Sequence, residues 1–325
     1  MDDNGHIVMA SKSTIATAPD GNGGLFMALY VSPLTIQGEV HTEMNVIDHM
    51  RQHGIKFVQI YGVDNAVVTI PDPVMFGLFI KEGDDAGNKC VMKNGPHERV
   101  GIVCKKGGKY NVVEYSELSE EIATKTAEDG SLVFGAGFIC NLYLTFDFLC
   151  QKCHPDSLPL LYHVAHKAIP YFDEVSQSIV KPKEPNGVKM ESFIFDVFPA
   201  SEKMGCLMVP RSEFTPVKNS NDAKFDCPES ACRIMTEIFK KWLEDAGCKL
   251  EGEMDPYSLE VAISPSLSID GENLEKLSGL TLQLPCLISS ASEIPETEMA
   301  TATELSSGVY VIKREFNHII VYFVC

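Results

Sequence analysis

The chain has 325 residues, of which 45% are hydrophobic, and a formal net charge of -18. Its length allows two domains with sizeable cores. The acidic balance excludes a general nucleic-acid binder, whose surface is basic, and no apolar run approaches the ~18 residues of a membrane span. Eleven cysteines without regular spacing, and no visible signal peptide, predict reduced thiols in a cytoplasmic protein.

The first feature along the chain is a glycine-rich loop, residues 18–24, which leads into a predicted helix from Leu25. Such a loop lets a ligand approach bare backbone. A helix N-terminus behind it offers free N–H groups that suit phosphates or uracil carbonyls. On spacing alone, a flexible turn is an equal alternative. Pro33 is expected to end this helix, and residues 43–53 resume a helical pattern.

The next signal is an apolar strand, residues 57–63, followed by Asp64. A helix followed by a strand predicts an α/β unit, in which ligands gather at the carboxyl ends of strands. Asp64 is therefore a candidate Mg²⁺ ligand, because Mg²⁺ prefers carboxylate, water and phosphate oxygens. The alternative is an ordinary turn or capping aspartate.

Further along, apolar runs predict strands at 89–92, 100–104 and 110–113, with Gly107-Gly108 as a hairpin turn between the last two. Helical patterns cover 141–150, 190–198 and, most clearly, 232–246. From Ser289 the sequence turns Ser/Thr/Glu-rich, which is typical of an exposed linker. The last residues, 318–325, are apolar and β-prone.

Two charged residues are candidates for chemistry on their own. Lys218 follows a Pro-containing turn and could neutralise a transferring phosphoryl group; a solvated surface lysine is the alternative. Glu114 ends a strand and could accept two sugar hydroxyls. Cys150-Gln151-Lys152-Cys153-His154 matches a haem-attachment pattern, but its surroundings fit neither haem nor the usual zinc spacing, so we favour helix-face cysteines.

Five short motifs occur in order: PDGNGG at 19–24, VDN at 63–65, VVEYSE at 112–117, PNGVKME at 185–191 and FTPVKN at 214–219. Together they resemble the eukaryotic UDP-N-acetylhexosamine pyrophosphorylases, from the first residues to about Leu287. The resemblance covers the later part of that family's chain. The family's Gly-rich nucleotide loop, which ends in Gly-Thr-Arg, normally lies upstream of the matched part.

The resemblance implies an α/β fold. We expect a Rossmann-like (GT-A-like) nucleotidyltransferase mixed sheet, N-terminally incomplete, over residues 1–215. A small α+β C-terminal domain is expected over 216–288. Residues 289–325 form a tail without a match and are expected to be linker-like.

The implied activity is uridylyl transfer: N-acetylhexosamine 1-phosphate attacks the α-phosphorus of UTP, and pyrophosphate leaves. Lys218 would be the catalytic cation and Asp64 would hold Mg²⁺. The residues implied to contact the substrates are Gly21, Asn22, Gly101, Glu114 and Lys189, the last as a phosphate contact.

Two features of the sequence depart from the family pattern. Phe138 stands where the family has an asparagine that helps to hold the N-acetylhexosamine, and a phenyl ring cannot make amide hydrogen bonds. Residues 31–42 interrupt a helix that the family runs without a break.

With the nucleotide loop outside this sequence, we expect slow turnover by the chain as given. A non-catalytic fragment or nucleotide-sugar-binding protein of the same fold stays open as the alternative.

Overall fold

The computed structural model describes residues 1–31, 33–36, 38–41, 44–158, 161–252, 258–306 and 308–313. The chain divides into two compact units. Unit 1 comprises Met1–Ile60 and Pro73–Met208, and unit 2 comprises Tyr61–Asp72 and Val209–Cys325. The expected boundary at 215/216 took no account of the excursion at 61–72, which carries Asp64 into unit 2.

Unit 1 is built on a six-stranded sheet in the order β12-β4-β7-β5-β6, with β3 also paired to β7. Its strands are β3 (Phe57–Tyr61), β4 (Ala86–Met92), β5 (Ile102–Lys106), β6 (Lys109–Val113), β7 (Ala136–Thr145) and β12 (Met204–Val209). The predicted β5–β6 hairpin is confirmed, because Gly107 and Gly108 both have the positive φ (59° and 77°) that its turn requires. Sheet and surrounding helices together give the expected α/β class.

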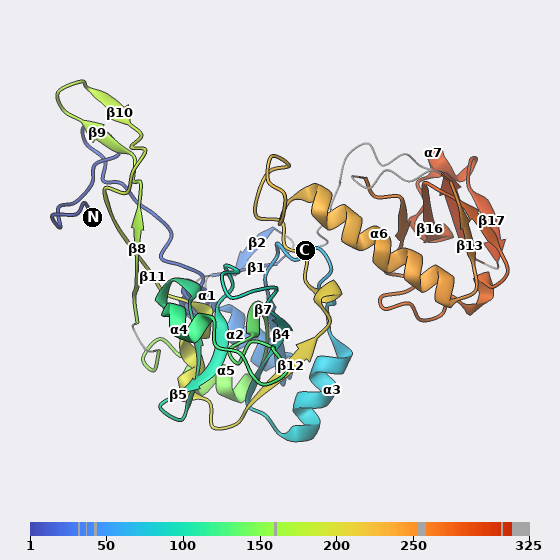
Figure 1. Ribbon diagram of the computed structural model, residues 1–325, viewed down its shortest axis with the longest axis horizontal. Helices are drawn as coiled ribbons and strands as arrows, with labels where there is room; N and C mark the ends of the chain where they lie inside the picture. The colour runs from blue at the N-terminus through green and yellow to red at the C-terminus, as the bar shows by residue number, and fades with distance from the viewer. Residues whose placement is uncertain are drawn as a thin grey trace. The chain divides into compact units, whose positions relative to one another are not determined.

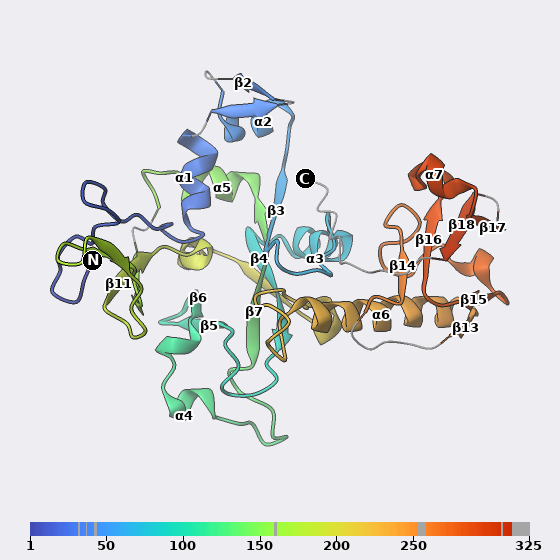
Figure 2. The ribbon, with the colours of Figure 1, turned by 90° about the horizontal axis from the view of Figure 1, so that it is seen from above.

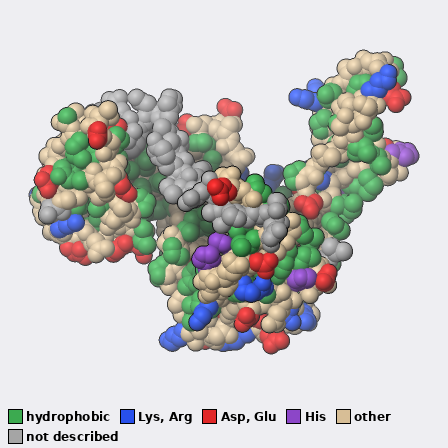
Figure 3. Space-filling model, turned by 180° about the vertical axis from the view of Figure 1, so that it is seen from behind, with side chains coloured by type: hydrophobic (Ala, Val, Ile, Leu, Met, Phe, Trp, Pro, Cys, Tyr) green, Lys and Arg blue, Asp and Glu red, His purple; other side chains and the backbone are tan. Residues whose placement is uncertain are grey.

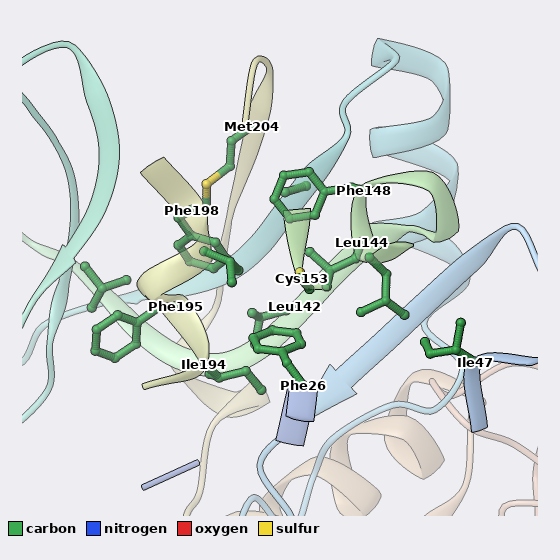
Figure 4. Packing of buried hydrophobic residues seen from close by; sticks show 14 residues of the cluster. Phe26, Ile47, Leu142, Leu144, Phe148, Cys153, Ile194, Phe195, Phe198 and Met204 are labelled. Atoms are coloured by element: carbon green, nitrogen blue, oxygen red, sulfur yellow. The ribbon is translucent and has the colours of Figure 1, made fainter. Parts of the chain in front are cut away.

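The helices of unit 1 are α1 (Gly24–Val31), α2 (Val46–Gln52), α3 (Pro73–Glu82), α4 (Glu120–Ala123), α5 (Phe146–Lys152) and the 3₁₀ segments η1 (Tyr115–Glu117) and η2 (Ile194–Ala200). Of these, α1, α2, α5 and η2 contribute buried residues to its main core. Figure 4 shows Phe26 of α1, Leu142 and Leu144 of β7 and Phe198 of η2 converging in this core. The glycine-rich loop is tied to the same core through Phe26, which is 1% exposed.

As predicted, α1 ends before Pro33. A short hairpin follows, made of β1 (Leu34–Ile36) and β2 (Glu39–His41). Thr42, the end of the segment that departs from the family pattern, lies outside the described residues.

A ribbon of paired strands extends from unit 1. Strand β8 (His163–Lys167) pairs with β11 (Gly187–Glu191), and β9 (Tyr171–Asp173) pairs with β10 (Ser178–Val180) at the far end (Figure 1). Apolar side chains lie along its surface (Figure 3). Val164 of β8 is 61% exposed.

Unit 2 packs one long helix, α6 (Pro228–Asp245), along two small sheets (Figure 2). One sheet pairs β13 (Lys249–Glu251) with β15 (Thr281–Gln283). The other joins β14 (Val261–Ile263), β16 (Cys286–Ser290), β18 (Val309–Lys313) and β17 (Thr303–Ser306). Shorter elements are η3 (Arg211–Glu213), η4 (Glu275–Leu277), η5 (Ala291–Glu293) and α7 (Glu296–Met299). No described helix of either unit is long and apolar enough to cross a bilayer.

Two helix predictions are wrong in part. Residues 141–145 belong to β7, and the helix begins only after Thr145, whose hydroxyl accepts the Phe148 N–H at 3.1 Å. Leu142, Tyr143 and Leu144 are all 0% exposed, so this strand is buried on both faces and lacks the alternation that distinguishes a strand. Residues 190–198 divide between β11 and η2, where Pro199 and the Asp196 cap favour a tight 3₁₀ segment.

The segment from Ser289, expected to be a linker, contributes to the sheet of unit 2. Strand β16 extends to Ser290, and β18 pairs with it from Val309 to Lys313. Val309 and Ile312 are 1% and 3% exposed, so burial of a few apolar residues outweighs the polar composition around them. The β-prone residues 318–325 lie outside the described residues.

Candidate active site

The glycine-rich loop is held against the segment that leaves β11. Gly21 has φ +97°, and a Cβ there would lie 2.1 Å from the carbonyl oxygen of Ser192. The Gly23 N–H donates to that oxygen at 3.0 Å, and the Ser192 N–H donates to the Asp20 carbonyl at 2.6 Å. The loop is thus pinned by backbone contacts that only glycine allows at position 21.

Asn22 uses its side chain to complete this contact. Its Oδ1 accepts the Ile194 N–H at 2.9 Å, at the start of η2. The Asp20 carboxylate lies beside the first residue of α1, because a Cβ on Gly24 would meet its Oδ1 at 2.8 Å. A carboxylate already occupies the positive end of the helix dipole, so this loop suits uncharged carbonyls better than phosphates.

Lys189 lies on β11, close to the same segment. Its ammonium is paired with the Glu191 carboxylate at 2.5 Å, and both side chains are about three-quarters buried, at 25% and 21% exposure. A phosphate contact by Lys189 would therefore have to compete with this ion pair.

Gly101 and Glu114 face each other across the β5–β6 hairpin. A Cβ on Gly101 would come within 3.2 Å of the Glu114 Oε1 and 2.9 Å of Val112. The Gly101 carbonyl accepts the Phe138 N–H at 2.8 Å. The Phe138 ring itself packs edge-on against Phe195, 5.4 Å between centroids, so its side chain belongs to the aromatic contacts of η2.

His163 links η1, which follows Glu114, to η2, which Asn22 contacts. Its Nδ1 lies 3.1 Å from the Glu117 carboxylate, and its Nε2 lies 2.9 Å from Asp196. Burial lowers the His163 pKa, but hydrogen bonds to Asp196 and Glu117 outweigh it and raise the pKa above its usual value. Asp196 also accepts the Phe193 N–H at 2.8 Å, which fixes the backbone next to the Asn22 contact.

A cavity of about 160 Å³ opens at this junction; its lining includes Val113, Glu117, His163, Phe195 and Asp196. Sequence reasoning did not find this cluster. The carboxylates lie 46 and 33 positions from the histidine, so no local pattern could reveal them.

In unit 2, backbone contacts join the Asp64 turn to the Lys218 loop. The Val217 N–H donates to the Asp64 carbonyl at 2.9 Å. Asn65, which is 4% exposed, accepts the Thr215 N–H on its Oδ1 at 2.9 Å and donates to the Glu213 carbonyl at 3.0 Å. Asn65, the third residue of the VDN motif, is therefore the clamp that holds the 213–217 segment. The Asp64 carboxylate takes no part in these hydrogen bonds.

Lys218 is exposed, and its ammonium lies 5.7 Å from the centre of the Phe214 ring. The guanidinium of Arg211, a residue that sequence reasoning missed, lies 5.3 Å from the same centre. Both cations therefore lie within cation–π distance of one buried ring. The only sequence signal for Arg211 was its position just before the FTPVKN motif.

The surroundings of Asp64 fit a single Mg²⁺ ligand. Its carboxylate is half-buried and has no hydrogen-bond or ionic partner within the described part of the chain. The described residues contain no group of three or more His, Cys, Asp or Glu side chains arranged to hold a metal. Mg²⁺ commonly takes one or two carboxylates and completes its shell with water and substrate phosphates.

The candidate residues thus fall into three places. Gly21, Asn22 and Lys189 gather around the β11 exit, Gly101 and Glu114 face each other in the hairpin, and Asp64 and Lys218 are neighbours in unit 2. The C-x-x-C-H segment begins on α5 and runs past its end, where the C-cap residue Cys153 is fully buried in the core and His154 packs on Tyr30.

Comparison with known proteins decides the family. The family model for UTP--glucose-1-phosphate uridylyltransferase matches residues 1–241. The chain belongs to this uridylyltransferase family. The human "UDP-N-acetylhexosamine pyrophosphorylase-like protein 1" is 39% identical over 300 residues, which are 87% of this chain and 56% of the human protein.

Two further members support the assignment. The UDP-N-acetylglucosamine pyrophosphorylase of Saccharomyces cerevisiae is 38% identical over 84% of this chain and 54% of the yeast enzyme. The solved structure of the Trypanosoma brucei UDP-N-acetylglucosamine pyrophosphorylase has a TM-score of 0.69 at 29% identity, over 85% of this chain and 55% of that one. The resemblance inferred from the five motifs is confirmed, and this uridylyltransferase-family chain spans a little over half the length of these relatives.

Proposed function

We propose that this protein is a uridylyltransferase that forms UDP-N-acetylhexosamine and pyrophosphate from UTP and N-acetylhexosamine 1-phosphate. The observation that carries the proposal is the pairing of the Asp64 turn with the Lys218 loop. A carboxylate without a partner among the described residues and an exposed ammonium thereby lie on neighbouring, rigidly held backbone. The matching family model and the matching yeast relative are a uridylyltransferase and a pyrophosphorylase by name.

In this proposal the chain's residues stabilise charge and hold the substrates. A sugar phosphate oxygen attacks the α-phosphorus of UTP in line, the bond to the leaving pyrophosphate breaks, and no covalent enzyme intermediate is needed. Mg²⁺ held by Asp64 would neutralise phosphate charge. The Lys218 ammonium, steadied by Phe214, would donate to the phosphate oxygens where negative charge develops.

Unit 1 would recognise the uncharged parts of the substrates. The bare backbone at Gly21 suits the edge of a flat base, and the amide nitrogen of the exposed Asn22 would donate to the substrate while its oxygen holds Ile194. Glu114 would accept sugar hydroxyls in the space that Gly101 leaves open. Lys189 would exchange its Glu191 partner for a phosphate.

We also place the enzyme in the cytoplasm. The ten described cysteines are all free thiols, the state that a reducing compartment maintains. UTP and a sugar phosphate are the partners that the proposal requires.

The direct test is pyrophosphate release from UTP and N-acetylglucosamine 1-phosphate with Mg²⁺, together with calorimetric binding of UDP-N-acetylglucosamine. We expect binding by the 325-residue chain and turnover below the common kcat range of about 1–10³ s⁻¹. Full turnover would contradict the expected slow rate and support the activity. Binding without any turnover, also in a chain extended to the length of its relatives, would favour the non-catalytic alternative.

The metal role is tested with Asp64→Asn in an active form of the protein. We expect the Mg²⁺ concentration for half-maximal rate to rise at least tenfold, the lower end of what lost metal-site groups cost. Asp222→Asn is the matched control, since Asp222 is an exposed aspartate of the same unit. An unchanged Mg²⁺ dependence in Asp64→Asn would remove Asp64 from the metal site.

A further inference from the structure

Two thiols meet on neighbouring strands of the unit 1 sheet. Cys90 of β4 and Cys206 of β12 lie with their Sγ atoms 3.4 Å apart, in a thiol–thiol hydrogen bond. The strands are adjacent in the sheet order, although the two residues are 116 positions apart in the chain. None of the roles proposed above uses either sulfur.

The two cysteines differ in access to solvent. Cys90 is 0% exposed, whereas Cys206 is the only exposed cysteine among the ten that the structure describes. An oxidant can therefore reach Cys206 but not Cys90, and a bond to Cys90 has to form from inside the protein.

The contact also makes the two sulfurs chemically unequal. The contact with Cys90 lowers the pKa of Cys206, while the contact with Cys206 and burial raise the pKa of Cys90. Cys206 is thus the thiol that ionises first and attacks, since the thiolate is the nucleophile in thiol–disulfide exchange. Cys90 remains protonated until its partner has reacted.

We propose that Cys90 and Cys206 are a reversible redox pair that closes to a disulfide in the presence of a small disulfide such as oxidised glutathione. The Cys206 thiolate attacks one glutathione sulfur, which forms a mixed disulfide and releases a glutathione thiolate. Cys90 then loses its proton to that thiolate and attacks the Cys206 sulfur, which releases the second glutathione. Two protein thiols are oxidised and one glutathione disulfide is reduced to two thiols.

The structural consequence concerns β12. This strand lies at one end of the sheet order, and the chain passes from it into unit 2 toward Lys218. A covalent bond to β4 would tie this edge strand to its neighbour and slow its opening. The reduced pair leaves β12 held only by its ladder and packing contacts.

The tryptic cleavage sites of the sequence allow the Cys90–Cys206 disulfide to be detected directly. Trypsin cleavage after Lys89, Lys93, Lys203 and Arg211 releases Cys90 and Cys206 in separate peptides, 90–93 and 204–211, each with one cysteine. The reduced protein is incubated with oxidised glutathione, alkylated, digested without reductant and analysed by mass spectrometry. We expect the linked pair 90–93/204–211 as the main disulfide product, and its loss on reduction.

Variants separate the steps. Cys90→Ala should leave glutathione bound to Cys206 as a mixed disulfide, because the resolving thiol is gone. Cys206→Ser should leave Cys90 unmodified, because it is buried. Cys104→Ser, at a half-buried thiol elsewhere on β5, is the matched control and should form the linked pair as the wild type does.

Three results would overturn the proposal. These are glutathione retained on Cys206 in the wild type with no linked pair, linkage of Cys206 to another cysteine, or reaction of Cys90 in folded Cys206→Ser. Circular dichroism of each variant confirms that it is folded, so each outcome bears on the thiol pair and not on misfolding.

Discussion

The two loops of this protein that carry motif residues are built in opposite ways. In the glycine-rich loop, the motif residues themselves hold the structure: Gly21 makes the close backbone approach to Ser192, and Asn22 accepts the Ile194 N–H. In the Asp64 turn, the neighbour Asn65 makes the hydrogen bonds to the 213–217 segment, and the Asp64 carboxylate has no partner among the described residues.

The two loops thus represent two ways of binding a ligand. A loop that presents bare backbone needs rigidity, so its glycine is required for steric reasons and its Asn22 side chain binds backbone. A turn that presents a charge needs a free side chain, so a buried amide nearby supplies the rigidity. Changes in the first loop should therefore act mainly through stability, and changes to Asp64 or Lys218 mainly through activity.

The largest effect is expected for Lys218→Ala in an active form of the protein. Loss of a preorganised cation typically lowers kcat by about 10²–10³, with a smaller change in KM for UTP. Lys224→Ala is the matched control, because Lys224 is an exposed lysine of the same loop. Steady-state kinetics decide: a kcat within a factor of about three of wild type would make Lys218 an ordinary surface lysine.

Gly21→Ala should mainly cost stability, by about 3 kcal/mol, because it adds positive-φ strain to a clash with the Ser192 carbonyl. Gly130→Ala has a similar φ of +82° but open space around the new methyl. It should cost only about 1 kcal/mol. Urea unfolding of both variants measures the difference, and equal costs would show that the Ser192 contact does not hold the loop.

Asn65→Ala should destabilise unit 2 by about 2 kcal/mol, because the buried Thr215 N–H and the Glu213 carbonyl lose the side chain that binds them. Asn219→Ala, which removes an exposed hydrogen bond to the Phe225 carbonyl, should cost less than about 0.5 kcal/mol. Denaturant midpoints compare the two. Equal small losses would contradict the clamp role of Asn65.

Phe138→Asn tests the residue that departs from the family pattern. It removes the ring contacts with Phe195 and Phe198 and places an amide among aromatic rings, so we expect a loss of about 1–2 kcal/mol at this half-buried site. If stability falls while the affinity for UDP-N-acetylglucosamine rises, the phenyl ring has been exchanged for a sugar contact. Unchanged stability would mean that the ring packing contributes little.

The smallest effect concerns His163 and pH. Because its folded-state pKa lies above the unfolded value of about 6.5, its contribution is fully present below that pH and is lost as pH rises through the raised pKa. His163→Gln should therefore flatten the decline of stability that sets in as the pH rises above about 6.5. His97→Gln, at an exposed histidine, serves as the control and should keep the wild-type decline, read as urea midpoints.

The sequence alone determined the α/β class, the points where a helix ends or a hairpin turns, and the motifs. Pro33 ends α1 because proline cannot continue a helix, Gly107-Gly108 turns the hairpin because both adopt positive φ, and the stripe of α6 identifies its buried face. These are local effects, readable within one turn or one strand.

Only the tertiary structure decided what each motif residue does. Burial on both faces made a strand of 141–145, and long-range contacts brought Asn22 to Ile194, His163 to Asp196 and Cys90 to Cys206. Partners in these pairs lie 33 to 172 positions apart. No periodicity records such distances, because they arise from how the sheet and its helices pack, and that packing depends on the whole core at once.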